Sequence, residues 1–400
     1  MKSNFNIADF ESAGGIIQGD LRSDLIDLGP GYLDPYLVPA ELIARWSAEA
    51  LRRWGPHALA YGADAGPREL RAQLAARVTA AGGARRCGAE NVLVTGGTSA
   101  ALDELAVGLA QEGRILLTEA LTYDLGRAIF AGRGVRTVPV AGPLDDLDVD
   151  EFRTAARQAA QSSGVTPAVY LIPTFHNPTG RLLSAERRRE ILSLAEETGA
   201  LVIEDLAYAD LGYETPPPPS LWDGAADPDQ VISLYSLAKC LAPGMRLGWM
   251  VSGERPVAEW ERSPVRVSGG GPNHFASMVS MAGLVNGEFR SHVSALRNEL
   301  RIRRDTLITT LMTQLPASFA VSQPAGGFFV WVRLPAGVSD EELLRLAEGL
   351  GVSFAVGRRF GISPGGVRLC FARYPPEQLA LGATRVAEAA GSILTSLKVR

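Results

Sequence analysis

Cysteine is scarce in this sequence: Cys87, Cys240 and Cys370 are the only three in 400 residues. They lie far apart, are odd in number and form no CxxC pair, so they indicate neither a disulfide framework nor a zinc or other metal site. A reducing compartment is the default for such a chain, and we expect a cytoplasmic protein.

Long apolar runs are also lacking. No run approaches the roughly 20 residues that span a bilayer, and residues 1–26 lack the continuous apolar core of a signal peptide. Charge of one sign does not dominate either, because 39 basic residues face 44 acidic ones, giving a net charge of −5 without a block of like charges. The sequence therefore gives no sign of binding to a membrane or to nucleic acid.

What the sequence does contain is an alternation of short apolar runs and helical patterns. A length of 400 residues favours two domains, or one large α/β domain with a lobe. The apolar runs, rich in Val, Ile and Leu, predict strands buried on both faces, and the alternation predicts a largely parallel sheet between helices. These runs are residues 91–97, 114–120, 167–175, 200–208, 230–239 and 246–253.

Two helices are predicted between these strands, over residues 98–113 and 184–199, the second with Ser184 as a candidate N-cap. The proline run at residues 216–220 predicts a surface loop. After residue 273 the pattern changes. Residues 274–312 predict one long helix, and short apolar segments then predict a second, smaller sheet in an α+β lobe. These segments are residues 326–335, 351–357 and 365–372.

Lys239 is the first residue that suggests chemistry. It follows an apolar run and has no acidic neighbour in sequence, so its ammonium group is expected to be partly buried and to lose its proton readily. Ser236 and Arg246 lie within the same eleven residues, with a Pro-Gly turn between Lys239 and Arg246. A hydroxyl and a guanidinium beside an unprotonated amine suit a ligand with a phosphate and a carbonyl.

Three further clusters follow predicted strands. Residues 96–99 (Gly-Gly-Thr-Ser) open a helix and could bind an anion, although, taken alone, they are better explained as an ordinary strand-to-helix turn. Asp205 ends a buried strand, where a carboxylate needs a cationic partner unless it is a helix N-cap. Asn177 precedes a Pro-Thr-Gly turn, and turn formation alone accounts for it. Ligands of α/β sheets bind beyond the carboxyl ends of the strands, where all these residues fall.

Pyridoxal phosphate is the one small molecule that accounts for all these clusters together. Its aldehyde needs an unprotonated lysine for a Schiff base, and its ring nitrogen needs an acidic partner. Its phosphate needs a helix start with Arg and Ser.

With these residues in place, the chain resembles the class I/II aminotransferases of the fold type I pyridoxal phosphate enzymes, from about Ile26 onward. It looks most like the branch of the 2-aminoadipate-type aminotransferases. The resemblance implies a mostly parallel seven-stranded sheet between helices in a large domain, residues 46–285, and a smaller α+β domain, residues 286–400. Residues 1–45 are expected to pack near the active site and the small domain. The motifs that carry the resemblance are residues 61–75, 94–105, 119–123, 173–180, 204–208, 236–249 and 365–372.

The resemblance also implies roles for single residues. Lys239 forms the Schiff base and acts as general base, and Asp205 pairs with the ring nitrogen. Arg368 grips the substrate carboxylate, although a surface strand arginine is the plain alternative. The other cofactor contacts are implied to be Asn177 and Tyr208 at the ring 3-oxygen, Tyr123 stacked on the ring, and Gly97, Thr98, Ser99, Ser236 and Arg246 at the phosphate.

Shared sites between two subunits are also implied, since the family is usually a homodimer. Tyr61 matches the tyrosine that the neighbouring subunit lends, and Tyr32 is a candidate substrate contact, as is Asn177. The departures from the family pattern are mild: Leu121 and Ala238 replace residues common in the family. His176 stands where Gln is frequent and is either structural or an additional acid or base.

The most direct function is amino transfer from an amino acid to a 2-oxo acid. The same site chemistry leaves open β- or γ-elimination, replacement or carbon–carbon bond formation, including reactions on a substrate like S-adenosylmethionine. A third hypothesis is a cofactor-binding regulatory domain. Such regulators carry an N-terminal DNA-binding module, whereas about 25 residues, which are not basic, precede the matched region here.

Overall fold

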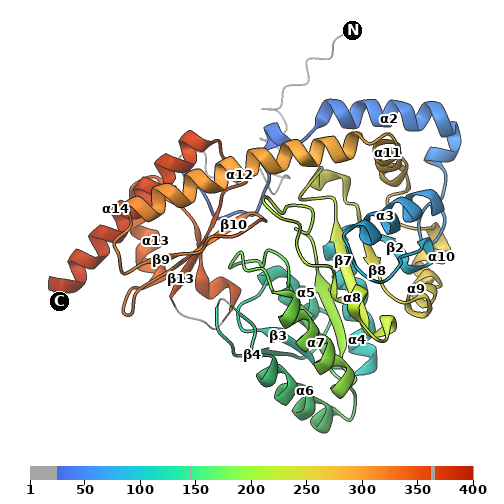
Figure 1. The fold of residues 1–400 in the computed structure, drawn as a ribbon, viewed down its shortest axis with the longest axis horizontal. Helices are drawn as coiled ribbons and strands as arrows, with labels where there is room; N and C mark the ends of the chain where they lie inside the picture. Colours follow the sequence, from blue (N-terminus) through green and yellow to red (C-terminus); the bar gives the residue numbers. More distant parts are fainter. Residues whose placement is uncertain (1–24, 145, 362–364, 400) are drawn as a thin grey trace.

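The computed structural model describes residues 25–144, 146–361 and 365–399. Figure 1 shows a large sheet packed between helices and a second sheet beside it, with a long helix, α12 (Glu288–Gln314), running along the same side of the molecule as both. Of the predicted N-terminal segment 1–45, residues 1–24 lie outside the described residues. The predicted division at residues 45 and 285 stays a prediction.

The large sheet has seven strands in the order β2-β8-β7-β6-β5-β3-β4. Every neighbouring pair is parallel except the two made by β8, which is antiparallel to both β2 and β7. The predicted mostly parallel seven-stranded sheet is therefore confirmed. Its strands are β2 (Val92–Thr95), β3 (Leu116–Glu119), β4 (Thr137–Val140), β5 (Ala168–Leu171), β6 (Leu201–Asp205), β7 (Val231–Ser236) and β8 (Gly248–Val251).

Strand β4 is not predicted by the sequence pattern. It is one of the two edge strands of the sheet, most of its residues are only partly buried or exposed, and it contains Pro139. An edge strand needs neither the continuous apolar run of a central strand nor a backbone N–H at every residue, so the pattern that predicts the other strands is missing here.

The sheet is buried on both faces, which explains the continuous apolar runs. Alternate residues of a strand point to opposite faces, and in β2 the side chains of Val92 and Val94 join one hydrophobic core while Leu93 joins another. The same alternation separates Val202 from Ile203 in β6. Two separate cores therefore clamp the sheet, and both need apolar side chains from every central strand.

Helices cover both faces of this sheet. The predicted Ser184 N-cap is confirmed, since its side chain accepts a hydrogen bond from the Arg187 amide at 3.1 Å. The helices up to residue 269 are α2 (Ala40–Trp54), α3 (Arg68–Ala80), α4 (Thr98–Glu112), α5 (Asp124–Gly132), α6 (Val149–Ser163), α7 (Ala185–Thr198), α8 (Leu221–Gly224), α9 (Glu254–Glu261) and α10 (Pro264–Gly269).

The prediction of one helix over residues 274–312 is wrong. The segment forms two helices, α11 (His274–Val285) and α12, separated at Asn286 and Gly287. Gly287 has a φ of +79°, a conformation that ends a helix and suits glycine. The Asn286 side chain accepts a hydrogen bond from the Glu288 amide at 3.0 Å and so caps the new helix start.

The predicted second sheet is present and has four antiparallel strands in the order β12-β13-β10-β9. The predicted segment 351–357 splits in two, because β11 leaves this sheet and pairs with β1 instead. The strands are β1 (Ile26–Asp27), β9 (Ala320–Val321), β10 (Phe329–Arg333), β11 (Val352–Ser353), β12 (Ala355–Val356) and β13 (Gly366–Cys370). The last helices are α13 (Asp340–Gly349) and α14 (Pro376–Val399).

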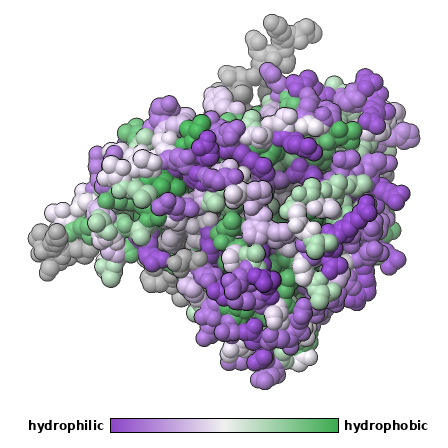
Figure 2. Space-filling view, in the orientation of Figure 1, coloured by the Kyte–Doolittle hydropathy of each residue, from purple (hydrophilic) through white to green (hydrophobic). Residues whose placement is uncertain are grey.

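On the face shown in Figure 2, hydrophilic residues cover most of the surface and hydrophobic ones form small groups among them. Among the described residues, every helix is too short or too polar to cross a lipid bilayer.

Candidate active site

The predicted site residues gather at one edge of the large sheet. Because β2, β3, β5, β6 and β7 are mutually parallel, their carboxyl ends meet at that edge. Tyr123 follows β3, Asn177 follows β5, Asp205 ends β6 and Lys239 follows β7. The second sheet contributes Arg368 from β13, so the site lies where the two sheets meet.

Lys239 is held among aromatic rings and a backbone carbonyl. Its Nζ donates a hydrogen bond to the Gly31 carbonyl at 3.0 Å and lies 5.7 Å from the centre of the Tyr208 ring and 5.8 Å from that of Phe328. Burial lowers the pKa of Lys239 from 10.5 to about 8. The amine can therefore give up its proton near neutral pH, as a Schiff base lysine must.

Asp205 is a buried carboxylate with two hydrogen-bond donors. Tyr170 donates its hydroxyl to Oδ2 at 3.0 Å, and the Ala207 amide donates to Oδ1 at 3.0 Å. Burial raises the pKa of Asp205 to about 6, although these two hydrogen bonds and the nearby Lys239 charge lower it. Residues 207–210 form turns, so Asp205 is not a helix N-cap. A buried carboxylate so placed favours a cation as its next partner.

Arg368 and Asn177 form a pair across the two sheets. Nη1 of Arg368 donates to Oδ1 of Asn177 at 2.7 Å, and Nη2 donates to the Gly29 carbonyl. The guanidinium lies 4.1 Å from the ring centre of Phe329 and 4.5 Å from that of Phe360. Arg368 is only 5% exposed, so it is not a surface strand arginine. Its buried Nε has no hydrogen-bond partner among the described residues, which suits an incoming carboxylate.

The predicted phosphate contacts meet at the start of α4. Gly97 precedes the helix with a φ of +89° and has no side chain to cap it, so the first amides of the helix stay available. Arg246 reaches this point from the amino end of β8 and donates from Nη2 to the Gly96 carbonyl at 3.2 Å. Ser236 ends β7, and Thr98 and Ser99 open the helix. This arrangement can hold a dianion.

The four predicted tyrosines differ in their placement. Tyr208 is buried and makes edge contacts with Phe328 and Phe329, at 5.3 and 5.7 Å between ring centres. Tyr123 is half-buried, and burial, with the charge of Asp205 next, raises its pKa to about 12. Tyr32 is close enough to influence the pKa of Tyr123 as well.

Tyr61 is the predicted site residue that the single chain does not bring to the others. It is 88% exposed. The loop that follows it packs on another segment of the chain, where the Gly271 amide donates to the Ala63 carbonyl at 2.9 Å. Its predicted role depends on a second subunit.

Several residues of the site are not found from the sequence. Tyr170 belongs to an apolar run, which gives no sign that its hydroxyl reaches Asp205. Phe329 and Phe360, which sandwich Arg368, carry no local signal beyond that of strand or loop residues. The Gly29 and Gly31 carbonyls accept hydrogen bonds from Arg368 and Lys239 through their backbone, which side-chain patterns cannot show.

The residues present fit pyridoxal phosphate. The start of α4 and Arg246 suit its phosphate, and the buried carboxylate of Asp205 suits a protonated ring nitrogen. The Lys239 amine, with its lowered pKa, suits the aldehyde. The charges of Asp205, Arg246 and Arg368 all act on the pKa of Lys239, so these groups lie near its amine.

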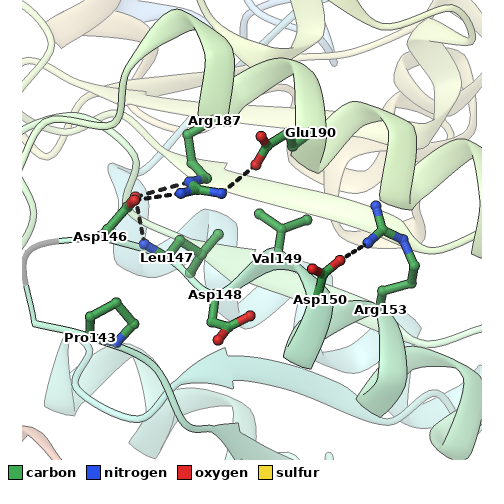
Figure 3. A pocket seen from close by; sticks show the side chains of 9 residues that line it. All are labelled: Pro143, Asp146, Leu147, Asp148, Val149, Asp150, Arg153, Arg187 and Glu190. Atoms are coloured by element: carbon green, nitrogen blue, oxygen red, sulfur yellow. Dashed lines mark hydrogen bonds and ion pairs between the residues drawn. The ribbon is translucent and has the colours of Figure 1, made fainter.

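A separate surface cavity of about 440 Å³ shows the contrast (Figure 3). It is lined largely by charged side chains, but these pair with one another: Arg187 with Asp146 and Glu190, and Arg153 with Asp150. None of its lining residues belongs to the predicted site. Both of its arginines are paired and its carboxylates outnumber them, so this cavity does not suit an anionic ligand such as a phosphate.

Comparisons with known proteins agree with this geometry. The family described as aminotransferase class I and II matches residues 31–386, which include every predicted site residue. A 2-aminoadipate transaminase from Thermus thermophilus is 30% identical over 401 residues, 96% of this chain and 97% of that protein.

Two further similarities bear on the function. An uncharacterized HTH-type transcriptional regulator of Bacillus subtilis (strain 168), YisV, is 30% identical over 350 residues, 86% of this chain and 70% of that protein. The crystal structure of LysN, an α-aminoadipate aminotransferase from Thermus thermophilus complexed with N-(5′-phosphopyridoxyl)-L-leucine, matches with a TM-score of 0.83 at 28% identity and 98% coverage of both chains.

The lowered pKa of Lys239 leads to a first prediction. The rate at which the cofactor-free protein takes up pyridoxal phosphate, followed by absorbance, should rise with pH around a midpoint near 8, because only the neutral amine attacks the aldehyde. Lys239→Arg should abolish the absorbance change. A midpoint close to the ordinary lysine pKa of 10.5 would show that the amine is not desolvated.

The second prediction concerns Gly97. Gly97→Ala should weaken binding of pyridoxal phosphate about tenfold or more, because a φ of +89° strains alanine and the new Cβ would lie 3.0 Å from Arg246 Nη2. Gly108→Ala is the matched control, since Gly108 lies inside α4 with open space around it. The control should leave binding unchanged and stabilise the protein by about 0.5–1 kcal/mol in urea unfolding. Equal binding by both variants would argue against a phosphate at this helix start.

Proposed function

We propose that this chain, which belongs to the class I and II aminotransferases and uses pyridoxal phosphate, moves the amino group of an amino acid to a 2-oxo acid with Lys239 as the base that carries the proton. The single observation that supports this role is the position of the Lys239 amine. It has a pKa of about 8 and lies close to both Asp205 and Arg368. When bound, the cofactor supplies an aldehyde for the amino group and a ring that withdraws electrons from the substrate Cα.

Arg368 binds the carboxylate that both substrates share. Its guanidinium is fixed by Asn177 and the Gly29 carbonyl and lies between two aromatic rings, so its remaining N–H groups keep one direction. A carboxylate bound to a guanidinium through two parallel hydrogen bonds has its orientation fixed as well. This orients the Cα–H bond of the amino acid toward Lys239.

Lys239 takes the proton from the substrate Cα and returns it at the carbon that receives the amino group. A general base works best when its pKa lies near the working pH, and burial brings the pKa of this amine down to about 8. The Gly31 carbonyl, which accepts a hydrogen bond from Nζ, holds the amine in place.

Asp205 holds a proton at the ring nitrogen. The positive charge there compensates the burial that raises the pKa of Asp205 to about 6, so the carboxylate stays ionised. Tyr170 and the Ala207 amide keep the carboxylate oriented. With the cofactor bound, Tyr208 and Asn177 would hold the ring 3-oxygen and Tyr123 would cover the ring.

The functional unit in this proposal is a homodimer. Exposed apolar side chains lie on two segments, residues 57–63 and 264–275, that contact each other through the hydrogen bond between His274 Nε2 and the His57 carbonyl at 3.0 Å. A second copy on this surface would bury them and bring Tyr61 to the neighbouring site. They are Leu59 (67% exposed), Tyr61 (88%), Val265 (82%), Val267 (60%) and Phe275 (38%). The cytoplasm suits this protein, since its three cysteines are free and buried.

A half-reaction tests the function. The holoprotein is given amino acids one at a time, and also S-adenosylmethionine, without any oxo acid. We expect a true donor to release one 2-oxo acid per subunit and then stop, and a second 2-oxo acid to restart the reaction. Repeated turnover without an acceptor would instead indicate elimination, replacement or bond formation. Binding of DNA without any turnover would favour a regulatory domain.

The role of Arg368 gives a further prediction. Arg368→Lys should lower kcat/KM about 100-fold for the amino donor and for the oxo acid alike, because lysine cannot make the bidentate pair. Arg45→Lys is the control, since Arg45 makes an exposed ion pair with Glu288, and it should change kcat/KM by less than about twofold. A loss for only one of the two substrates would move the carboxylate site away from Arg368.

A further inference from the structure

A buried polar cluster lies directly beside Asn177 and has no part in the chemistry described above. It consists of Glu119 at the end of β3 and His176, Thr179 and Arg181 in the loop after β5. His176 is 1% exposed and Glu119 and Thr179 are each 6% exposed. Polar groups so deeply buried destabilise the fold unless they are paired, so we expect this cluster to have a structural or functional role.

His176 closes the turn that carries Asn177. Its amide donates to the Arg181 carbonyl at 2.8 Å, and its carbonyl accepts from the Gly180 amide at 2.7 Å. Its side chain adds a third link, since Nδ1 lies 2.8 Å from the Thr179 hydroxyl. Asn177 stands inside this closed turn, so its backbone position depends on these links.

Arg181 and Glu119 tie this turn to the neighbouring strand. Arg181 pairs through Nη2 with Glu119 Oε2 and donates from Nη1 to the Asp146 carbonyl at 2.9 Å. The carboxylate of Asp146 in turn accepts hydrogen bonds from Nε and Nη2 of Arg187 (Figure 3). The other Glu119 oxygen lies 3.4 Å from His176 Nε2. The turn is therefore tied to the end of β3 through the side chains of Arg181 and His176.

His176 is neutral in this cluster. Burial lowers its pKa to about 4, even though Glu119 opposes the shift. A neutral imidazole has one N–H, and we assign it to Nε2, which faces the carboxylate of Glu119, so that Nδ1 accepts from the Thr179 hydroxyl. The ring therefore makes one hydrogen bond, to Thr179, while Nε2 lies 3.4 Å from the Glu119 carboxylate without forming a second one. A cavity of about 40 Å³ borders Glu119 and His176 and has room for a water molecule beside them.

The pair of Asn177 and Arg368, which this turn supports, allows only one orientation of the Asn177 side-chain amide. The side-chain oxygen of Asn177 must face Arg368, because the side-chain nitrogen of Asn177 would place its N–H donors against the N–H donors of the guanidinium. Since Arg368 lies between the rings of Phe329 and Phe360, Asn177 and the Gly29 carbonyl decide the rotation of the guanidinium in its plane. A shift of the turn would rotate the bound carboxylate.

We propose that His176 is a positioning residue for substrate: through Thr179 and Glu119 it fixes the turn from which Asn177 orients Arg368 toward the substrate carboxylate. This inference rests on the proposed role of Arg368. It gives His176 a function in substrate binding without contact with the reacting atoms.

Four variants of the holoenzyme test this. His176→Leu keeps approximate size but removes the hydrogen bond to Thr179 and the polar contact with Glu119, whereas His176→Gln keeps one donor for Glu119 and one acceptor for Thr179. Thr179→Val and Thr179→Ser repeat the contrast at the other end of the same hydrogen bond. Three quantities are measured for each: KM and kcat for the amino donor, Kd for the analogue of the donor that lacks its amino group, and Kd of the cofactor-free protein for pyridoxal phosphate.

We expect His176→Leu and Thr179→Val to raise KM and the analogue Kd about five- to tenfold, the effect of losing the hydrogen bond between these two residues. They should leave kcat within about twofold and the cofactor Kd unchanged. His176→Gln and Thr179→Ser should stay within about twofold of the native protein throughout.

Three results would overturn the inference. Native KM in both His176→Leu and Thr179→Val would show that the hydrogen bond positions nothing. A fall in kcat with KM unchanged would make His176 an acid or base, and equal losses of cofactor and analogue binding in the Leu and Gln variants would make it a packing residue. If the native protein fails the half-reaction, or Arg368→Lys keeps native substrate binding, the proposed function fails instead, and the contrast in analogue Kd separates the two cases.

Discussion

Burial of ionisable groups where two sheets meet is the constraint on which the rest of this structure depends. Lys239, Asp205 and Arg368 are each desolvated there, and desolvation disfavours the charged form of every one of them. Each of them has a fixed hydrogen-bond partner that lowers this cost. The Gly31 carbonyl accepts from Lys239, the Tyr170 hydroxyl donates to Asp205, and the Asn177 side-chain oxygen accepts from Arg368. The part of the desolvation cost that these partners leave uncompensated favours binding of a ligand with charges opposite to those of the three residues.

The fold is arranged to supply these partners from distant parts of the chain. Arg368 comes from the second sheet, Asn177 and Asp205 from the first, and the Gly29 and Gly31 carbonyls from the segment before α2. The two sheets are also joined near the site, where the Thr122 amide, next to Tyr123, donates to the Phe360 carbonyl at 3.0 Å. Small movements between the sheets would therefore change Arg368 and the cofactor ring contacts together.

The sequence predicts much of the fold because burial on both faces leaves a strong local signal. Central strands such as β5 and β6 need apolar residues throughout, whereas the partly exposed edge strand β4 does not and escapes prediction. The break before α12 depends on the backbone of a single glycine, Gly287, inside an otherwise helical pattern. Lys239, Asp205 and Arg368 stand in recognisable motifs, but Tyr170 reaches Asp205 only through the pairing of β5 with β6, which lies outside any local pattern.

His176 shows the same limit most clearly. From the sequence, a histidine beside Asn177 is either a structural residue or an additional acid or base, because sequence position says nothing of which way the ring faces. The structure turns its two nitrogens toward Thr179 and Glu119, away from the chemistry, and burial keeps its pKa low and the ring neutral. A buried neutral imidazole that is hydrogen-bonded to Thr179 and lies against Glu119 is well suited to hold a turn. In the proposed role, His176 acts on the substrate through this turn and without contact with it.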